Sequence, residues 1–156
     1  MDKSVRLRPI TPEDDLFLAA VYASSRAEEL AVTGWSDEQK EIFCRRQFDA
    51  QSAYYIANYP AASFQLIERE GAPVGRLYVA RWDKEIRIVD ITLLPEFRGS
   101  GLGTKLLRDL RDEARAAGKS LTIHVERFNR ALQLYQRLGF EQVEDKGVYL
   151  LMEWRK

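Results

Sequence analysis

The sequence has one cysteine, one histidine and no net charge in its 156 residues. Cys44 and His124 are too few to build a His/Cys zinc cluster, so we expect no metal. An unpaired cysteine suits a reducing compartment, which predicts a cytoplasmic protein. Lys+Arg and Asp+Glu are equal at 24 each, so no general attraction to nucleic acid or to an anionic membrane is expected. The longest apolar run, residues 16–23, is too short to span a bilayer. The length fits a single domain over residues 1–156.

A glycine-rich stretch, Phe97–Leu107 (FRGSGLGTKLL), lies between an apolar strand pattern and a helical pattern. Its glycines, Gly99, Gly101 and Gly103, allow positive φ angles and a close approach of a ligand to the backbone. The first N–H groups of the helix that follows have no acceptor within that helix. Together with the helix dipole they favour an anion. The stretch therefore predicts a phosphate-binding turn.

Two common phosphate loops do not fit this stretch. A Walker loop requires Gly-Lys-Ser/Thr, but here Gly103 is followed by Thr104 and then Lys105. The dinucleotide pattern G-x-G-x-x-G requires a third glycine where Thr104 or Lys105 stands. Two alternatives remain open at this point, namely a strand-to-helix connection without a ligand and nucleotide binding by an unrelated α/β domain.

The rest of the chain alternates between helical and strand patterns in the order β-α-α-β-β-β-α-β-α-β-β. A helix separates the fourth strand from the fifth, so these two should be parallel. Helices are predicted from Thr11 to about Leu30, from Ser36 to before Pro60, over 101–117 and over 129–138. Strands are predicted over 5–10, 64–68, 74–82, 86–94, 120–125, 140–144 and 148–153.

Two motifs together resemble the GNAT superfamily of acyl-CoA-dependent N-acyltransferases. Arg98-x-x-Gly101-x-Gly103 is similar to the family's pyrophosphate loop, Q/R-x-x-G-x-G/A. Residues 125–140 (VERFNRALQLYQRLGF) look like its strand–Asn–A-x-x-L-Y-x-x-x-G-F segment. The element order extends the resemblance to nearly the whole chain. It implies an α/β fold with a central mixed, mostly antiparallel sheet of about seven strands, four helices and two splayed parallel strands in the middle.

The resemblance also implies acetyl-CoA as the co-substrate. A backbone N–H near Leu93 would polarise the thioester carbonyl. Asn129 would contact the pantetheine arm, although it is equally suited to cap a helix. Arg98 would add charge to the loop, or would be an ordinary surface arginine. The full set of cofactor-binding residues implied is Ile91, Thr92, Leu93, Leu94, Arg98, Gly99, Ser100, Gly101, Leu102, Gly103, Thr104, Asn129 and Tyr135.

Three residues are candidates for proton transfer. Tyr135 matches the family tyrosine that protonates the leaving thiolate, and the alternative is an aromatic residue in the core. His124 and Asp90 are candidate bases that would accept the proton of the amine. The alternative for both is a structural polar residue with satisfied hydrogen bonds. Glu85 and Arg87, at the far end of the strand of Asp90, are expected to be solvated charges.

The acceptor would bind between the first two helices and the last hairpin. Glu28 and Glu29 would attract a cationic amine, with Trp35 and Tyr149 as further contacts. A pair of surface acids without a ligand is the alternative. The sequence leaves open whether the acceptor is a polyamine, an amino acid, an antibiotic or a protein amine. A non-catalytic acyl-CoA-binding module is the second reading of the chain, and a homodimer is compatible with both.

Overall fold

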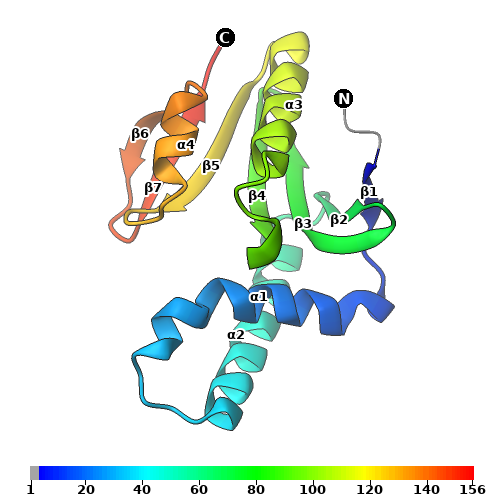
Figure 1. Ribbon diagram of the computed structural model, residues 1–156. Coiled ribbons are helices and arrows are strands. Elements are labelled where there is room, and N and C mark those ends of the chain that lie inside the picture. Colours follow the sequence, from blue (N-terminus) through cyan, green and yellow to red (C-terminus); the bar gives the residue numbers. More distant parts are fainter. Residues whose placement is uncertain (1–3) are drawn as a thin grey trace. The chain divides into compact units, whose positions relative to one another are not determined.

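The computed structural model describes residues 4–156, so residues 1–3 of the expected domain lie outside the described residues. Figure 1 follows the chain from β1 to β7 through four α-helices, in the predicted order. The strands are β1 (Val5–Pro9), β2 (Ser63–Arg69), β3 (Ala72–Arg81), β4 (Glu85–Leu93), β5 (Ser120–Glu126), β6 (Glu141–Asp145) and β7 (Tyr149–Trp154). The helices are α1 (Asp15–Ala31), α2 (Asp37–Asn58), α3 (Leu102–Ala117) and α4 (Leu132–Arg137), with short 3-10 turns at Pro12–Asp14 and Pro95–Phe97.

The strands form one mixed sheet in the order β1-β2-β3-β4-β5-β7-β6. β4 and β5 are parallel, and their ladder pairs Glu85 with Ser120 through Ile88 with Ile123. β1 with β2, β5 with β7 and β6 with β7 are antiparallel. The predicted fold class is therefore confirmed, including the parallel pair in the middle of the sheet.

The chain divides into two compact units, and the first comprises Met1–Tyr78 with Asp90–Arg98. Its helices pack on each other, and α2 begins at a capping box in which Ser36 and Gln39 exchange hydrogen bonds of 3.1 and 2.9 Å. One hydrophobic cluster joins both helices to β2. Its buried members are Leu18, Tyr22, Leu30, Cys44, Phe48 and Leu66.

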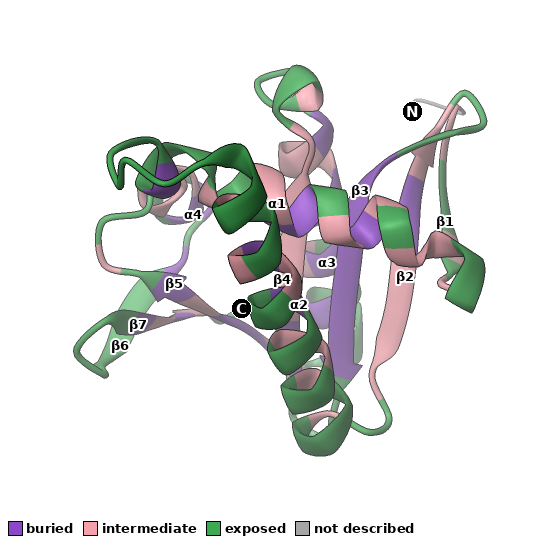
Figure 2. Ribbon diagram, turned by 90° about the horizontal axis from the view of Figure 1, so that it is seen from below, coloured by how far each residue is buried: buried purple, intermediate pink, exposed green. Residues whose placement is uncertain are grey.

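The second unit comprises Val79–Val89 with Gly99–Lys156. α3 is amphipathic because its apolar residues recur three and four positions apart, and this face packs against β5. The buried residues of α3 are Leu102, Leu106, Leu107, Leu110 and Ala114. Figure 2 shows the same distinction between elements elsewhere in the chain, since β3 is buried along most of its length and α2 is largely exposed.

The last helix is shorter than predicted. The pattern indicated a helix from Asn129, but α4 begins at Leu132. The side-chain oxygen of Asn129 accepts a hydrogen bond from the N–H of Ala131 at 2.8 Å, and its carbonyl accepts from Leu132 at 3.1 Å. Asparagine competes with helical hydrogen bonding in this way. It therefore forms a turn that precedes the helix.

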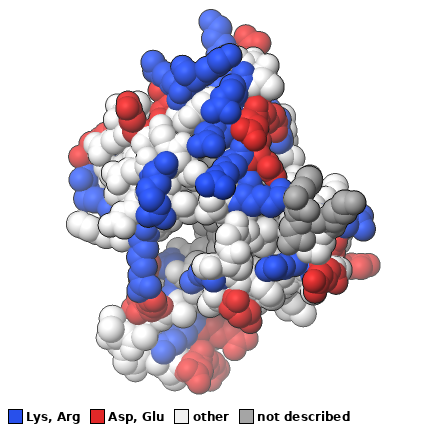
Figure 3. Space-filling model, turned by 45° about the horizontal axis from the view of Figure 1, so that its top comes forward, with Lys and Arg blue, Asp and Glu red and all other residues white. Residues whose placement is uncertain are grey.

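Charged residues of both signs cover the surface. Figure 3 shows Lys and Arg side chains gathered in bands over the visible face, with Asp and Glu beside them. Many of these charges are paired, as in Lys105–Asp109 at 2.7 Å and Arg115–Asp112 at 3.2 Å on α3. Across residues 4–156, no helix combines the length and the apolar character needed to cross a membrane.

Candidate functional site

The glycine turn between the Pro95–Phe97 turn and α3 has the backbone shape that an anion site needs. Gly99 and Gly101 have φ angles of 73° and 86°, and a Cβ on either would meet no atom within 4 Å. Gly101 is the N-cap of α3, whose first turn contains no acidic residue. The N–H groups at this helix start therefore carry the positive end of a 16-residue helix dipole. The prediction was wrong for Gly103, which lies in the first turn of α3 and is not among the positive-φ glycines.

Arg98 ties the start of this turn to the end of β4. Its Nε donates to the carbonyl oxygen of Leu93 at 3.1 Å. The N–H of Leu94 donates to the carbonyl of Val74 at 2.9 Å, which holds the same strand end against β3. Arg98 is exposed, so its guanidinium also remains in contact with solvent. The structure thus gives Arg98 a positioning contact that neither sequence alternative included.

Tyr135 is a buried residue on α4. Its side chain is 6% exposed, and its ring packs edge-on against Phe140 with the centroids 5.6 Å apart. This packing agrees with the core alternative and is compatible with a functional hydroxyl. Asn129, which forms the turn before α4, is engaged through its side chain with Ala131 and so is closer to the capping alternative.

Asp90 lies on β4 in a dense hydrogen-bonded cluster of the first unit. Its Oδ1 accepts from Thr92 Oγ1 at 2.7 Å and from Arg76 Nε at 3.2 Å. Its Oδ2 accepts from Tyr55 Oη at 2.8 Å and from Arg76 Nη2 at 3.0 Å. Arg76 Nη2 also reaches Gln51 Oε1 at 2.8 Å. Four donors thus saturate the carboxylate, which is the arrangement of the structural alternative.

His124 lies on β5 of the second unit beside Arg87. Nη1 of Arg87 is 3.3 Å from His124 Nδ1. Because arginine can only donate, Nδ1 is the acceptor and the neutral ring carries its proton on Nε2. Burial lowers the pKa of His124, and the positive charges of Arg87 and Lys146 lower it further, against smaller opposing effects of Glu144 and Glu85. The imidazole is therefore neutral at pH 7.

Arg87 and Glu85 are not the solvated charges that the sequence predicted. The Arg87 side chain is only 12% exposed, and it donates to Glu85 at 2.9 Å and to Thr122 Oγ1 at 2.7 Å. Its guanidinium also lies 5.2 Å from the ring centroid of Trp82. The sequence carried a signal for this network, because a parallel pairing of the two predicted strands puts alternate residues of both on one face.

Arg76 is the functional neighbour that sequence reasoning missed in the first unit. It is 2% exposed and pairs with Asp90. An arginine within the apolar run of β3 could have indicated a buried partner, because an unpaired buried charge is strongly disfavoured.

The residues expected to bind the acceptor are placed at the surface. Glu29 is paired with Arg26 at 3.0 Å, and Glu28 is exposed next to it. Trp35 is 39% exposed and packs edge-on against Phe43 with the centroids 5.1 Å apart. Tyr149, on β7 of the second unit, is 46% exposed.

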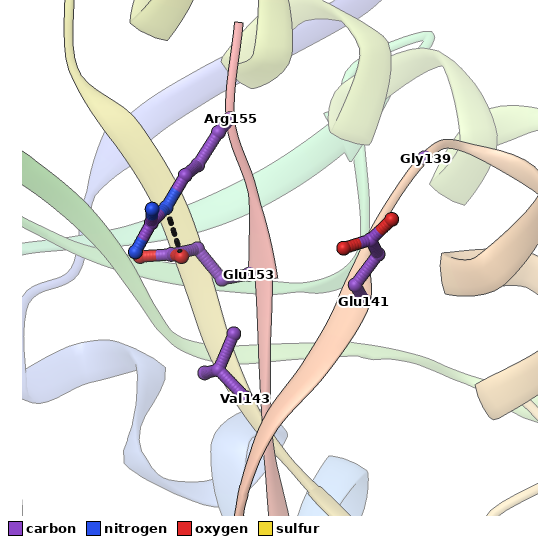
Figure 4. Close-up of a pocket in the computed structure, with 5 residues that line it drawn as sticks. All are labelled: Gly139, Glu141, Val143, Glu153 and Arg155. Atoms are coloured by element: carbon purple, nitrogen blue, oxygen red, sulfur yellow. Dashed lines mark hydrogen bonds and ion pairs between the residues drawn. The ribbon is translucent and has the colours of Figure 1, made fainter.

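A separate cavity of about 260 Å³ lies at β6 and β7. Figure 4 shows Glu141 and Glu153 on the two neighbouring strands, with Glu153 paired to Arg155. Gly139 and Val143 complete the lining. The two carboxylates would repel a diphosphate, so we assign no part of the cofactor to this cavity. Within the described part of the chain, no group of His, Cys, Asp or Glu side chains is arranged to hold a metal ion.

Comparison with known proteins gives a consistent result. The profile of the Acetyltransferase (GNAT) family matches residues 20–140. An uncharacterized N-acetyltransferase of Methanocaldococcus jannaschii is 27% identical over 155 residues, which cover 91% of this chain and 63% of that protein. The chain thus spans less than two thirds of the length of this curated relative.

Two solved structures share the fold. The PaiA N-acetyltransferase of Thermoplasma acidophilum, in complex with coenzyme A, is 19% identical and superposes with a TM-score of 0.72 over 98% of this chain and 99% of its own. A structure from Salmonella typhimurium with its cofactor acetyl-CoA is 22% identical, with a TM-score of 0.58 over 98% and 94%.

We predict that Arg76→Met lowers the free energy of unfolding by about 3–5 kcal/mol, because it leaves the Asp90 carboxylate buried and unpaired. The double variant Arg76→Met/Asp90→Asn should recover part of this loss. Arg81→Met, which breaks a pair with Glu113 that is 41% exposed on both sides, is the control and should cost about 1 kcal/mol or less. Urea unfolding measures all three, and equal costs for Arg76→Met and Arg81→Met would contradict the prediction.

A second prediction concerns the pKa of His124, which NMR can follow without ambiguity because the chain has one histidine. We expect the pKa to lie below 6.5 and to rise in Arg87→Met, whereas Arg127→Met, which breaks the distant pair with Asp145, should leave it unchanged. Since the unfolded chain takes up this proton first as the pH falls through 6.5, protonation should lower the free energy of unfolding below that pH. An unchanged pKa in Arg87→Met would refute the assigned contact.

Proposed function

The chain belongs to the Acetyltransferase (GNAT) family, and on that premise we propose that it transfers an acetyl group from acetyl-CoA to a primary amine. The matched residues, 20–140, include parts of both compact units. We therefore propose that the two units form one acetyltransferase domain over residues 1–156.

The observation that supports this function best is the glycine turn at the start of α3. Gly99 and Gly101 hold left-handed backbone angles with open space beside them, and a long helix with no acid in its first turn follows. A diphosphate suits this combination of N–H donors and positive dipole. In the proposal, residues 98–104 bind the diphosphate of coenzyme A, and residues 91–94 of β4 pair with its pantetheine arm.

The proposed reaction is a direct attack within a complex of both substrates. The nitrogen lone pair of the amine forms a bond to the thioester carbonyl carbon, while a backbone N–H near Leu93 stabilises the negative oxygen. The C–S bond then breaks, and the Tyr135 hydroxyl gives its proton to the leaving thiolate. The new amide nitrogen loses a proton to a base.

Cysteine chemistry does not support an acyl-enzyme alternative. Cys44 is 6% exposed on α2, and burial raises the pKa of its thiol despite the opposing charge of Arg26. A protonated, enclosed thiol is a poor nucleophile. This supports the direct route.

The identity of the base distinguishes the two polar clusters. Asp90 accepts hydrogen bonds from three side chains, one of them the Arg76 guanidinium, so its protonation would weaken a buried ion pair. His124 is already neutral, and the contact with Arg87 occupies its lone pair at Nδ1. We propose His124 as the base, acting once Arg87 releases Nδ1.

The test of the function is release of the coenzyme A thiol from acetyl-CoA in the presence of amines. The panel should include a polyamine, free amino acids, an aminoglycoside and peptides with a free N-terminus. Turnover with at least one acceptor supports the proposal. Tight binding of acetyl-CoA without turnover of any amine would instead favour a non-catalytic binding module.

We predict that Gly101→Val abolishes binding of coenzyme A, because valine strains a φ of 86° and fills the space beside the turn. Gly71→Val is the matched control, since Gly71 has a φ of 81° and equally open surroundings in the β2–β3 turn. Titration calorimetry should show that affinity is lost in the first variant only. Equal affinity in both would mean that the turn does not hold the diphosphate.

For the proposed acid, Tyr135→Phe should lower kcat by about a hundredfold or more while the affinity for acetyl-CoA stays close to that of the natural chain. Tyr54→Phe, at a 57% exposed position on α2, serves as the control for loss of a hydroxyl. Steady-state rates and calorimetry separate the two effects. A kcat that survives Tyr135→Phe would remove this residue as the acid.

The base can be tested by comparing pH–rate profiles with the NMR titration. If His124 accepts the proton, the acidic limb of kcat/KM should follow the pKa of His124 and shift upward with it in Arg87→Met. His124→Ala should lose that limb. A limb that stays at the same pH while the imidazole pKa moves would exclude His124 as the base.

A further inference from the structure

A second cavity, of about 330 Å³, lies entirely within the first unit. It lies between the start of α1, the C-terminal half of α2 and strands β2 and β3. Its floor is closed, because Phe48 and Tyr78 are 4% and 5% exposed, and its rim is open, because Ile56 is 65% exposed. The lining shares no described residue with the glycine turn or with the residues proposed to bind the cofactor.

Aromatic rings form the walls of this cavity and hold one another in place. Phe64 packs edge-on against Tyr78 with the centroids 5.0 Å apart, and Tyr55 does so on Tyr78 at 5.9 Å and 89°. The Tyr55 hydroxyl is fixed by its hydrogen bond to Asp90. Walls held in this way do not need to be ordered when a ligand binds, which favours affinity. Their ring faces suit an apolar body or a cation.

The charge at the rim is negative. Among the described lining residues, Asp15 carries the formal charge, and its side chain is 47% exposed. Hydrogen bonds from Arg45, at 2.7 and 3.1 Å, lower the pKa of Asp15 and keep it ionised. Each carboxylate oxygen has a second lone pair that can accept from another donor.

Arg45 shows that a cation is already accommodated at this rim. Its guanidinium lies 5.6 Å from the ring centroid of Phe48, a cavity wall, while it binds Asp15. A carboxylate and an aromatic face are the two groups that recognise an ammonium ion. A ligand carboxylate, in contrast, would face Asp15 directly.

We propose that this cavity is a binding site for a small arylalkylamine, with its ring between the aromatic walls and its ammonium group on Asp15. Ser52, a half-buried lining residue on α2, faces the same space. The site lies apart from the glycine turn in its residues, so it does not depend on acetyl-CoA. It adds a second ligand to the one implied by the proposed function.

Titration calorimetry of the full chain with 2-phenylethylamine, without coenzyme A, tests the proposal. Binding should be measurable, and 3-phenylpropionate, which has the same ring but a carboxylate, should bind at least tenfold more weakly. Ser52→Trp should abolish binding because the indole fills the cavity. Asp15→Asn should weaken binding about fivefold. Asp49→Asn, which removes the other partner of Arg45 but does not alter the lining, should leave affinity unchanged.

Thermal unfolding verifies that each variant folds. If Ser52→Trp does not fold, Asp15→Asn and intermolecular NOEs between the ligand ring and Phe64 carry the test. The proposal is overturned if the natural chain does not bind 2-phenylethylamine, if the carboxylate binds as well as the amine, or if a folded Ser52→Trp variant retains affinity. The last result would place the amine elsewhere on the chain.

Discussion

The proposed chemistry depends on a backbone constraint at the end of β4, where two residues must adopt left-handed φ angles before α3 begins. Residues with a Cβ are disfavoured in this conformation, and Gly99 and Gly101 adopt it without steric cost. The turn leaves the first N–H groups of a long helix pointing away from their own helix. The geometry for anion binding is therefore present in the backbone itself, and Arg98 adds a contact that holds the turn to β4.

Each compact unit contains an arginine that controls a candidate base. Arg76 forms a buried pair with Asp90, which keeps the carboxylate charged and engaged on both oxygens. Arg87 contacts the imidazole of His124 and keeps it neutral. The same residue type thus has opposite effects, because a cation stabilises a nearby anion and destabilises a nearby second cation. This difference makes His124 the residue that could change its protonation near neutral pH.

Tyr55 connects two features of the first unit. Its ring is a wall of the aromatic cavity, while its hydroxyl donates to Asp90 on β4. Asp90 directly precedes the residues proposed to pair with the pantetheine arm. A ligand in the cavity would therefore contact a side chain that is hydrogen-bonded to the strand of the proposed cofactor site, through a chain of two residues.

The sequence by itself determined the order of elements, the helix start at Ser36 and the glycine turn, because caps, turns and hydrophobic periodicity act over a few neighbouring residues. It also indicated that Asp90, in an apolar strand, needed a partner. Only the tertiary structure decided that this partner is Arg76, that Arg87 contacts His124 and that α4 starts after the turn formed by Asn129. Such pairings join strands or helices far apart in sequence, or depend on competition between side chain and backbone, and local patterns do not encode them.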